Sequence, residues 1–519
     1  MQPLDIDQDS IEVDSYMFQS VGAEGIQYLA KAMNLPLFQS KIQRKAECCS
    51  LSYEVTTNDE VEDLFELLSV VRDKFDNIGG LVTGAILSNY QRERIENICE
   101  RLSWVSLAYL WRRDQKELLL DIVGAGIAAK IVKACIAAFG LNIECDLGSW
   151  IADFVPHVFL LADDPSCGLN PCGEGGEFET FTFDCPLYVK RIVPMEQPKV
   201  LIHSSDPFST VAYLRYKGFR LENKEVSDIR LTKEALLKIE NEVLVGDKVV
   251  HRRPFISNLE RLAKLSDEVA SEISCDISSS KHNEFPIDDA LLAAPVINSP
   301  GIRLFHGGLL LTATCVGVSY LISLLGGAGL KPDQLIHYHV TTNADLSDPN
   351  IATTISEPLK LLFDTPSVRK RRVGNAPPSQ VCISSHWPVE ALNLIRDVRL
   401  LPEITERELI VVGLSGIAVA GGTETTIIDV MRVRSLSHWA PAVVAPHSQA
   451  VRVGSHCIFA GQVGIMPETL QLPPISVESP VDHLPLHIDQ QCWLALRHVH
   501  RVMKVRVSLS SKNPLVGFL

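Results

Sequence analysis

Hydrophobic residues along the first 195 positions follow two patterns, one typical of helices and one typical of strands. Between residues 61 and 71 they recur every three or four positions, which predicts one face of an amphipathic helix. Thr57 and Glu60 stand just before this stretch and predict a capping box at the start of the helix. The residues of the predicted face are Val61, Leu64, Leu68 and Val71.

Continuous apolar runs predict buried strands between the helices. They are GGLVTGAIL at 79–87, VSLAYLW at 105–111 and AAKIVKAC at 128–135, with a helix near 88–102 after the first run and a later helix before the third. Strands separated by helices are typical of a doubly wound parallel sheet in an α/β domain. Ligands of such sheets bind beyond the carboxyl ends of the strands, so we expect a site at the loops that follow Ile86 and Leu110.

The remainder of the chain divides less clearly. We expect the first domain to span 1–195, an intervening segment and linker 196–290, and two further modules 291–400 and 440–519. The uncharged stretch 307–330 is long enough for a membrane span, but it contains six glycines and several hydroxyl side chains. We therefore expect it to form a strand followed by an amphipathic helix, with no membrane partner.

Composition limits the classes of partner. The 519 residues carry a net charge of -15, which disfavours nucleic acid because phosphate contacts need clustered lysine and arginine. The 13 cysteines show no repeated spacing, and we expect reduced thiols in a cytoplasmic protein. A small ligand or a protein partner fits these values better than a polyanion.

The stretch CGEGGEFET at 172–180 holds three carboxylates on a flexible backbone. Gly175 and Gly176 allow a tight turn or a close approach to a ligand. Glu177 and Glu179, two apart in an extended segment, are expected to point to the same side and to need a cation between them. Candidate cations are Mg²⁺ on a nucleotide, an ammonium ion or neighbouring arginines, and the alternative is an exposed acidic turn.

Four polar clusters occur in order between Ile11 and Val193: DSYMFQ at 14–19, GAILSNYQR at 84–92, YLWRRDQ at 109–115 and GEGGEFET at 173–180. Together they resemble the diphthine–ammonia ligase family. The resemblance implies a sheet of the nucleotide α-hydrolase type, which is Rossmann-like. It also implies a reaction in which ATP, with Mg²⁺, and ammonium convert diphthine on translation elongation factor 2 into diphthamide, releasing AMP and pyrophosphate.

The resemblance also implies roles for particular residues. Because ammonium must lose a proton before it attacks, we expect Glu174 and Glu177 to attract and deprotonate it, with Glu179 orienting them or holding Mg²⁺. We expect Trp111 to pack in the core, and Arg113 or Asp114 to belong to a surface pair. The residues expected to bind the nucleotide or the modified histidine are Gly84, Ala85, Tyr90, Gln91, Arg92, Arg112 and Thr180.

The sequence departs from the family at its start. The printed chain contains no phosphate loop of the form S-G-G-K-D-S, so we expect the nucleotide-binding domain to be N-terminally incomplete, through an incomplete gene model or a real isoform without activity.

The two C-terminal modules resemble RidA/YjgF-like α+β domains, the second only in part. Gln380 stands where imine deaminases of that family have arginine. A scaffold or metabolite sensor that assembles into homo-oligomers through these modules, and an imine deaminase, are the alternative functions.

Overall fold

The protein is described from a computed structural model. Its chain divides into two compact units, Met1–Arg261 with Ser435–Trp439, and Leu262–Arg434 with Ala440–Leu519. Apart from isolated strands given below, the structure describes residues 2–3, 17–18, 22–50, 53–135, 140–204, 210–224, 428–443, 447–453, 456–473 and 485–508.

The first unit contains a short parallel sheet. Strand β3 (Gly80–Val82), helix α3 (Asn89–Leu102) and strand β4 (Val105–Leu107) form a crossover in which Gly80 lies opposite Val105. Helix α2 (Glu60–Lys74) packs with α3 and β3 in one hydrophobic cluster, and Val61, Leu64, Leu68 and Val71 all belong to it. The predicted helical face is therefore confirmed, as is the helix expected near 88–102.

Two local predictions for this region were wrong. Helix α2 is capped by Asp59, whose carboxylate accepts the backbone N–H of Val61, so Thr57 is not the cap. The strand expected over 79–87 is limited to β3, and Val82 in it is 68% exposed. Both helices pack against one face of this sheet, so the apolar run is not buried on both faces as predicted.

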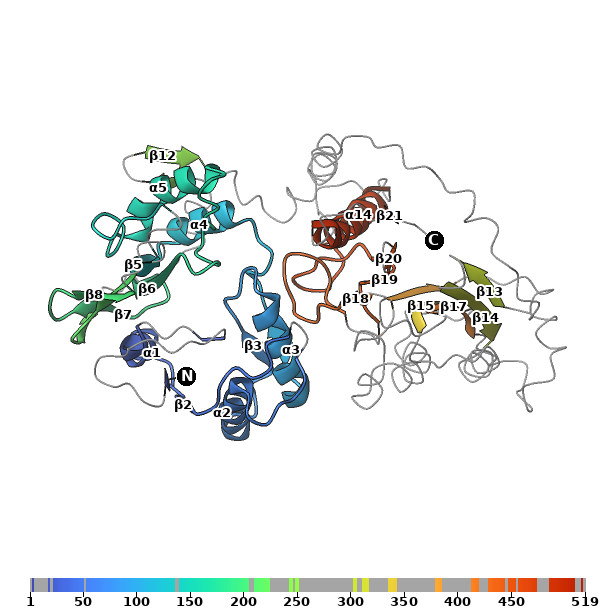
Figure 1. Ribbon diagram of the computed structural model, residues 1–519, viewed down its shortest axis with the longest axis horizontal. Coiled ribbons are helices and arrows are strands. Elements are labelled where there is room, and N and C mark those ends of the chain that lie inside the picture. Colours follow the sequence, from blue (N-terminus) through green and yellow to red (C-terminus); the bar gives the residue numbers. More distant parts are fainter. Residues whose placement is uncertain are drawn as a thin grey trace. The chain divides into compact units, whose positions relative to one another are not determined.

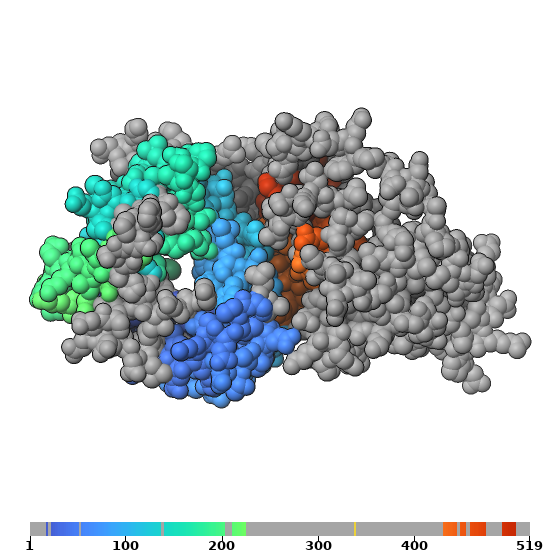
Figure 2. Space-filling view, viewed as in Figure 1, coloured from blue at the N-terminus to red at the C-terminus, as the bar shows by residue number. Residues whose placement is uncertain are grey.

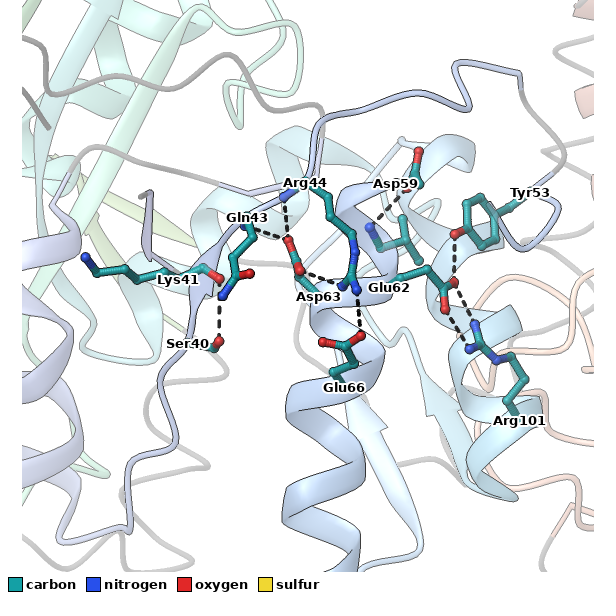
Figure 3. A network of polar contacts seen from close by, with 11 residues as sticks. Ser40, Lys41, Gln43, Arg44, Tyr53, Asp59, Glu62, Asp63, Glu66 and Arg101 are labelled. Carbon is teal, nitrogen blue, oxygen red and sulfur yellow. Dashed lines mark hydrogen bonds and ion pairs between the residues drawn. The ribbon is translucent and has the colours of Figure 1, made fainter. Parts of the chain in front are cut away.

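Charged side chains join the start of α2 to its neighbours (Figure 3). Asp63 accepts the backbone N–H groups of Gln43 and Arg44 at 2.7 and 2.9 Å and also binds the Arg44 guanidinium at 2.7 Å. Glu62 accepts two bonds from Arg101 on α3, at 2.8 and 2.7 Å, and one from the Tyr53 hydroxyl at 2.8 Å. These contacts fix α2 against α3, while residues around α2, in blue, form an exposed surface of the unit (Figure 2).

The second sheet of this unit corrects the prediction of a single doubly wound parallel sheet. Its order is β6-β5-β9-β8, and every pair in it is antiparallel. Strand β5 is the predicted run 128–135, but its partners β6 and β9 come from later in the chain and both run antiparallel to it. The strands are β5 (Ala128–Cys135), β6 (Phe178–Asp184), β8 (Lys199–Ser204) and β9 (Val211–Arg215).

Both faces of this antiparallel sheet are covered. Helices α4 (Gln115–Gly124) and α5 (Ile151–Asp163) pack on one face, and α1 (Ile26–Met33) packs on the other (Figure 1). Ile131 contributes to the first core and Val132 to the second, as alternation along a strand requires. The remaining elements of this unit are β1 (Gln2–Pro3), the 3-10 helix Ala23–Gly25, β2 (Lys41–Ile42), β7 (Lys190–Pro194), β10 (Phe219–Asn223), β11 (Glu242–Val245) and β12 (Lys248–His251).

The second unit contains two sheets. The first has the order β13-β14-β17-β15-β16, and the second the order β18-β19-β20-β21 with helix α14. Because β17 lies between β14 and β15, the first sheet extends beyond residue 400. The bounds are β13 (Ile302–Phe305), β14 (Leu310–Val316), β15 (Leu335–Thr342), β16 (Ser379–Ser384), β17 (Val412–Val419), β18 (Ile428–Met431), β19 (Ala450–Val453), β20 (His456–Phe459), α14 (Pro485–Ser508) and β21 (Leu515–Val516).

Several sequence predictions for the second half stay predictions. Strand β14 confirms the strand half of the uncharged stretch 307–330, while its helical half and the linker at 268–289 lie outside the described residues. Gln380 lies on β16, and the likeness of the two sheets to RidA-like modules is untested. No helix in the described part of the chain has the length and apolar character that a bilayer span requires.

Candidate functional site

Glu174 connects the acidic loop to the loop that follows strand β3. Its Oε2 atom accepts the backbone N–H groups of Ile86 and Leu87, at 3.2 and 2.7 Å. Both donors lie just before Ser88, which caps α3 by accepting the N–H of Gln91 at 3.1 Å. Among the described residues Oε1 has no partner, so one oxygen of a half-buried carboxylate remains available to a ligand.

Arg112 reaches the same loop from the segment after strand β4. Its backbone N–H donates to the carbonyl of Ile86 at 2.8 Å, and its φ of 63° is a left-handed conformation that is uncommon outside glycine. Among the described residues Arg112 forms no ion pair, and its Nε atom is buried without an acceptor. Burial, together with the positive charge of Arg92, lowers the pKa of Arg112. An anion at this position would stabilise the guanidinium.

Arg92 has a different environment, although it lies nearby. It is 6% exposed and bridges to Glu93 at 2.6 Å and to the fully buried Glu96 at 2.8 Å. Burial opposes its charge, but the charges of Glu96 and Glu93 raise its pKa above the usual value. The guanidinium also lies 5.0 Å from the ring of Trp111, which is 1% exposed, so the predicted core position of Trp111 is confirmed.

Glu177 holds the acidic loop together. Its Oε1 accepts the backbone and side-chain N–H groups of Asn170 at 2.9 and 2.7 Å, and its Oε2 accepts the N–H of Gly175 at 2.7 Å. The side chain is fully buried. A Cβ on Gly175 would lie 2.7 Å from Glu177 Oε1, whereas Gly176 has a φ of 85°. The two glycines are thus needed for different reasons, close approach and backbone conformation.

Gln115, the first residue of α4, ties this loop to the segment YLWRRDQ. Its side-chain oxygen accepts the N–H of Cys172 at 3.0 Å, and its side-chain nitrogen contacts Asn170 Oδ1 at 3.3 Å. Burial, with the charges of Glu174 and Asp114, raises the pKa of Cys172 to about 12, so its thiol stays protonated. Within the described ranges ten cysteines, including Cys167 and Cys172, are free thiols, and the same ranges contain no group of three potential metal ligands.

The other predicted site residues are only partly brought together. Glu179 pairs with Lys133 at 3.1 Å across the β5–β6 pair, so its carboxylate and that of Glu177 have different partners. Thr180 lies opposite Ile131 in the same pair. The hydroxyl of Tyr90 contacts the carbonyl of Cys48 at 3.4 Å.

The positions of Gly84, Ala85, Arg113 and Asp114 are also described by the structure. Gly84 is exposed and Ala85 is 9% exposed, and both follow β3 instead of ending it. Arg113 forms an ion pair with Asp121, while Asp114 caps α4 by accepting the N–H of Glu117 at 2.9 Å. Of the cluster at 14–19, only residues 17 and 18 are described.

Sequence reasoning missed three residues that organise the site: Glu96, Gln115 and Asn170. Glu96 stands four positions after Arg92 on a helix, a spacing that favours an ion pair and could have been noticed. Gln115 and Asn170 act through contacts between residues far apart in the chain, which local patterns do not reveal.

Comparisons with known proteins identify the family of the chain. Residues 7–106 match the family described as diphthamide synthase N-terminal domain, and residues 121–205 match the diphthamide synthase C-terminal domain. The diphthine–ammonia ligase of Rattus norvegicus is 45% identical over 224 residues, which are 43% of this chain and 82% of the relative. The diphthine–ammonia ligase of Homo sapiens is 43% identical, also over 43% of this chain and 82% of the relative. The diphthine–ammonia ligase of Schizosaccharomyces pombe is 31% identical over 95% of this chain and 71% of the relative. The chain therefore belongs to the diphthine–ammonia ligase family and is a ligase of diphthamide biosynthesis.

Proposed function

We propose that this ligase uses ATP to activate the carboxylate of diphthine on translation elongation factor 2 and then transfers ammonia to it. The observation that carries the proposal is the meeting of three sequence-distant clusters at Ile86, which donates its N–H to Glu174 and accepts the N–H of Arg112. The shared residue brings an anionic and a cationic side chain to the loop beyond β3, where parallel sheets bind ligands.

Arg112 binds the phosphates in this proposal. Its charge is not compensated by any described carboxylate, whereas Glu93 and Glu96 already neutralise Arg92. A guanidinium donates two parallel hydrogen bonds to phosphate oxygens, which suits a nucleotide whose α-phosphate is attacked. Mg²⁺ enters with the triphosphate as part of the substrate.

Glu174 receives the ammonium ion. The diphthine carboxylate attacks the α-phosphate, pyrophosphate leaves, and the acyl adenylate forms. Ammonium has no lone pair, so it gives a proton to Glu174 Oε1 before the nitrogen attacks the acyl carbon and AMP departs. Glu177 keeps Glu174 in place through the loop instead of taking the proton, because three N–H groups already occupy its two oxygens.

The remaining residues keep the roles that the sequence resemblance implies. Tyr90, Gln91, Gly84, Ala85 and Thr180 line or support the loops around the nucleotide in this proposal, and Glu179 contributes through its pair with Lys133. A cytoplasmic location and assembly into homo-oligomers stay predictions from the sequence.

Arg112→Gln tests the phosphate role. The assay measures pyrophosphate release by the full chain with ATP, ammonium and elongation factor 2 carrying diphthine. Loss of a charged hydrogen bond costs about 1.5–3 kcal/mol, so we expect the KM for ATP to rise about tenfold to a hundredfold. Arg72→Gln is the control, since Arg72 is exposed and pairs with Asp73 on α2. An unchanged KM for ATP in Arg112→Gln would contradict the assignment.

A further inference from the structure

A short segment of the second half of the chain completes the parallel sheet of the first unit. Ser435–Trp439 belongs to that unit, and Leu436 bridges to Leu107 on β4 in parallel orientation. The N–H of Leu436 donates to the carbonyl of Ser106, and the N–H of Ala108 donates to the carbonyl of Leu436, both at 2.9 Å. Strand β4 is therefore paired on both edges, with β3 on one and this segment on the other.

The segment also contacts the buried ion pair beneath the site. Ser435 donates its N–H and its hydroxyl to Glu96 Oε1, at 2.9 and 2.7 Å, while Glu96 Oε2 holds Arg92 at 2.8 Å. Ser435 and Glu96 are fully buried or nearly so. A carboxylate that loses two buried donors is destabilised by more than the bonds alone are worth, because water does not replace them. Ser435 thus orients the carboxylate that orients Arg92.

The aromatic end of the segment supports the same arginines. The Trp439 ring meets Trp111 edge to face, with ring centroids 5.1 Å apart. Trp111 in turn has the Arg92 guanidinium 5.0 Å and the Arg112 guanidinium 5.3 Å from its ring. Trp439 is 6% exposed, and removing it would leave space beside Trp111. Both arginines depend on where that indole lies.

We propose that Ser435–Trp439 is an intrachain edge strand that fixes Arg92 and Trp111, and through the Trp111 ring the position of Arg112, with Ser435 and Trp439 as positioning residues. The inference rests on the proposed function, in which Arg112 binds the phosphates of ATP. The segment lies outside residues 7–106 and 121–205, which the two family descriptions cover, so it adds a dependence of the ligase site on the second half of the chain.

The test compares Ser435→Ala, Trp439→Ala and Trp439→Phe in the full chain. For each variant that keeps the wild-type thermal transition, we expect the KM for ATP to rise about threefold to tenfold, as loss of one or two supporting contacts predicts, while the KM for ammonium stays unchanged. Trp439→Phe keeps an aromatic edge and should show the smaller effect. Ser166→Ala is the control, because Ser166 is exposed and bonds only to Asp164 on the surface.

A second measurement separates positioning from general stability. If Ser435 acts through Glu96, then the effects of Ser435→Ala and Glu96→Gln on the KM for ATP should not add in the double variant. Additive effects in the double variant would overturn the inference, and so would a wild-type KM for ATP in folded Ser435→Ala and Trp439→Phe. If Arg112→Gln still showed a raised KM for ATP, the proposed function would stand. A wild-type KM in Arg112→Gln would overturn both, and the two failures are therefore distinguishable.

Discussion

Replacement of Glu177 by glutamine changes one atom of a buried carboxylate that accepts three hydrogen bonds. Glutamine keeps one oxygen and puts an NH₂ group where the other was. If its oxygen faces Asn170, the NH₂ group opposes the N–H of Gly175, and in the other orientation it opposes two N–H groups of Asn170. Either orientation leaves at least one buried donor without an acceptor.

The magnitude follows from these contacts. A hydrogen bond to a charged group contributes about 1.5–3 kcal/mol, and a stranded buried donor adds to the loss, so we expect about 2–4 kcal/mol of destabilisation. For a unit of this size each kcal/mol shifts the melting temperature by about 2–4 °C, which gives a decrease of about 4–16 °C. Glu174→Gln should cost little by comparison, because both N–H donors of Glu174 bind one oxygen, which glutamine retains.

Thermal unfolding and pyrophosphate release over rising ammonium distinguish the two glutamates. Glu174→Gln should keep its melting temperature, lose rate at low ammonium and recover at high ammonium, since a neutral amide attracts the cation weakly. Glu177→Gln should melt earlier and should not recover with ammonium. Glu144→Gln is the control, because Glu144 is exposed on the surface. A Glu177→Gln protein that melts normally and is rescued by ammonium would refute the positioning role and make Glu177 an ammonium ligand.

Two further predictions concern stability. Asp59→Ala removes the N-cap of α2 and the carboxylate oxygen that accepts the backbone N–H groups of Glu47 and Cys48, at 3.0 and 2.8 Å. Urea unfolding should show that the free energy of unfolding falls by about 2–4 kcal/mol. Asp73→Ala is the control and should change it very little, because Asp73 is exposed. Burial and the charge of Arg497 lower the pKa of His498 from 6.5 to about 3, so the unfolded chain takes up a proton that the folded state refuses. The free energy of unfolding should therefore fall as pH drops below about 6.5, by about 2 kcal/mol at pH 5. In His498→Gln the free energy of unfolding, measured with urea, should change less between pH 5 and pH 7 than in the wild type. An equal change in both proteins would contradict this prediction.

The success of the sequence predictions depended on the range of the contacts involved. The apolar face of α2 depends on local spacing, and it was predicted correctly. Asp59 displaced Thr57 as the cap because its second oxygen also accepts two N–H groups of a preceding loop, a contact between non-neighbouring residues. The partners of β5 could not be predicted for the same reason, since alternation of helices and strands does not reveal which later strand pairs with which.

The peptide groups of Ile86 keep two oppositely charged side chains at one loop, as the proposed function requires. Its N–H holds the anionic Glu174 and its carbonyl holds the backbone of the cationic Arg112, yet the two side chains form no ion pair with each other among the described contacts. Direct pairing would neutralise both charges and leave neither for a ligand. Because the backbone anchors each side chain separately, Glu174 keeps one oxygen and Arg112 keeps its charge, and in the proposed function these are the groups that bind ammonium and phosphate.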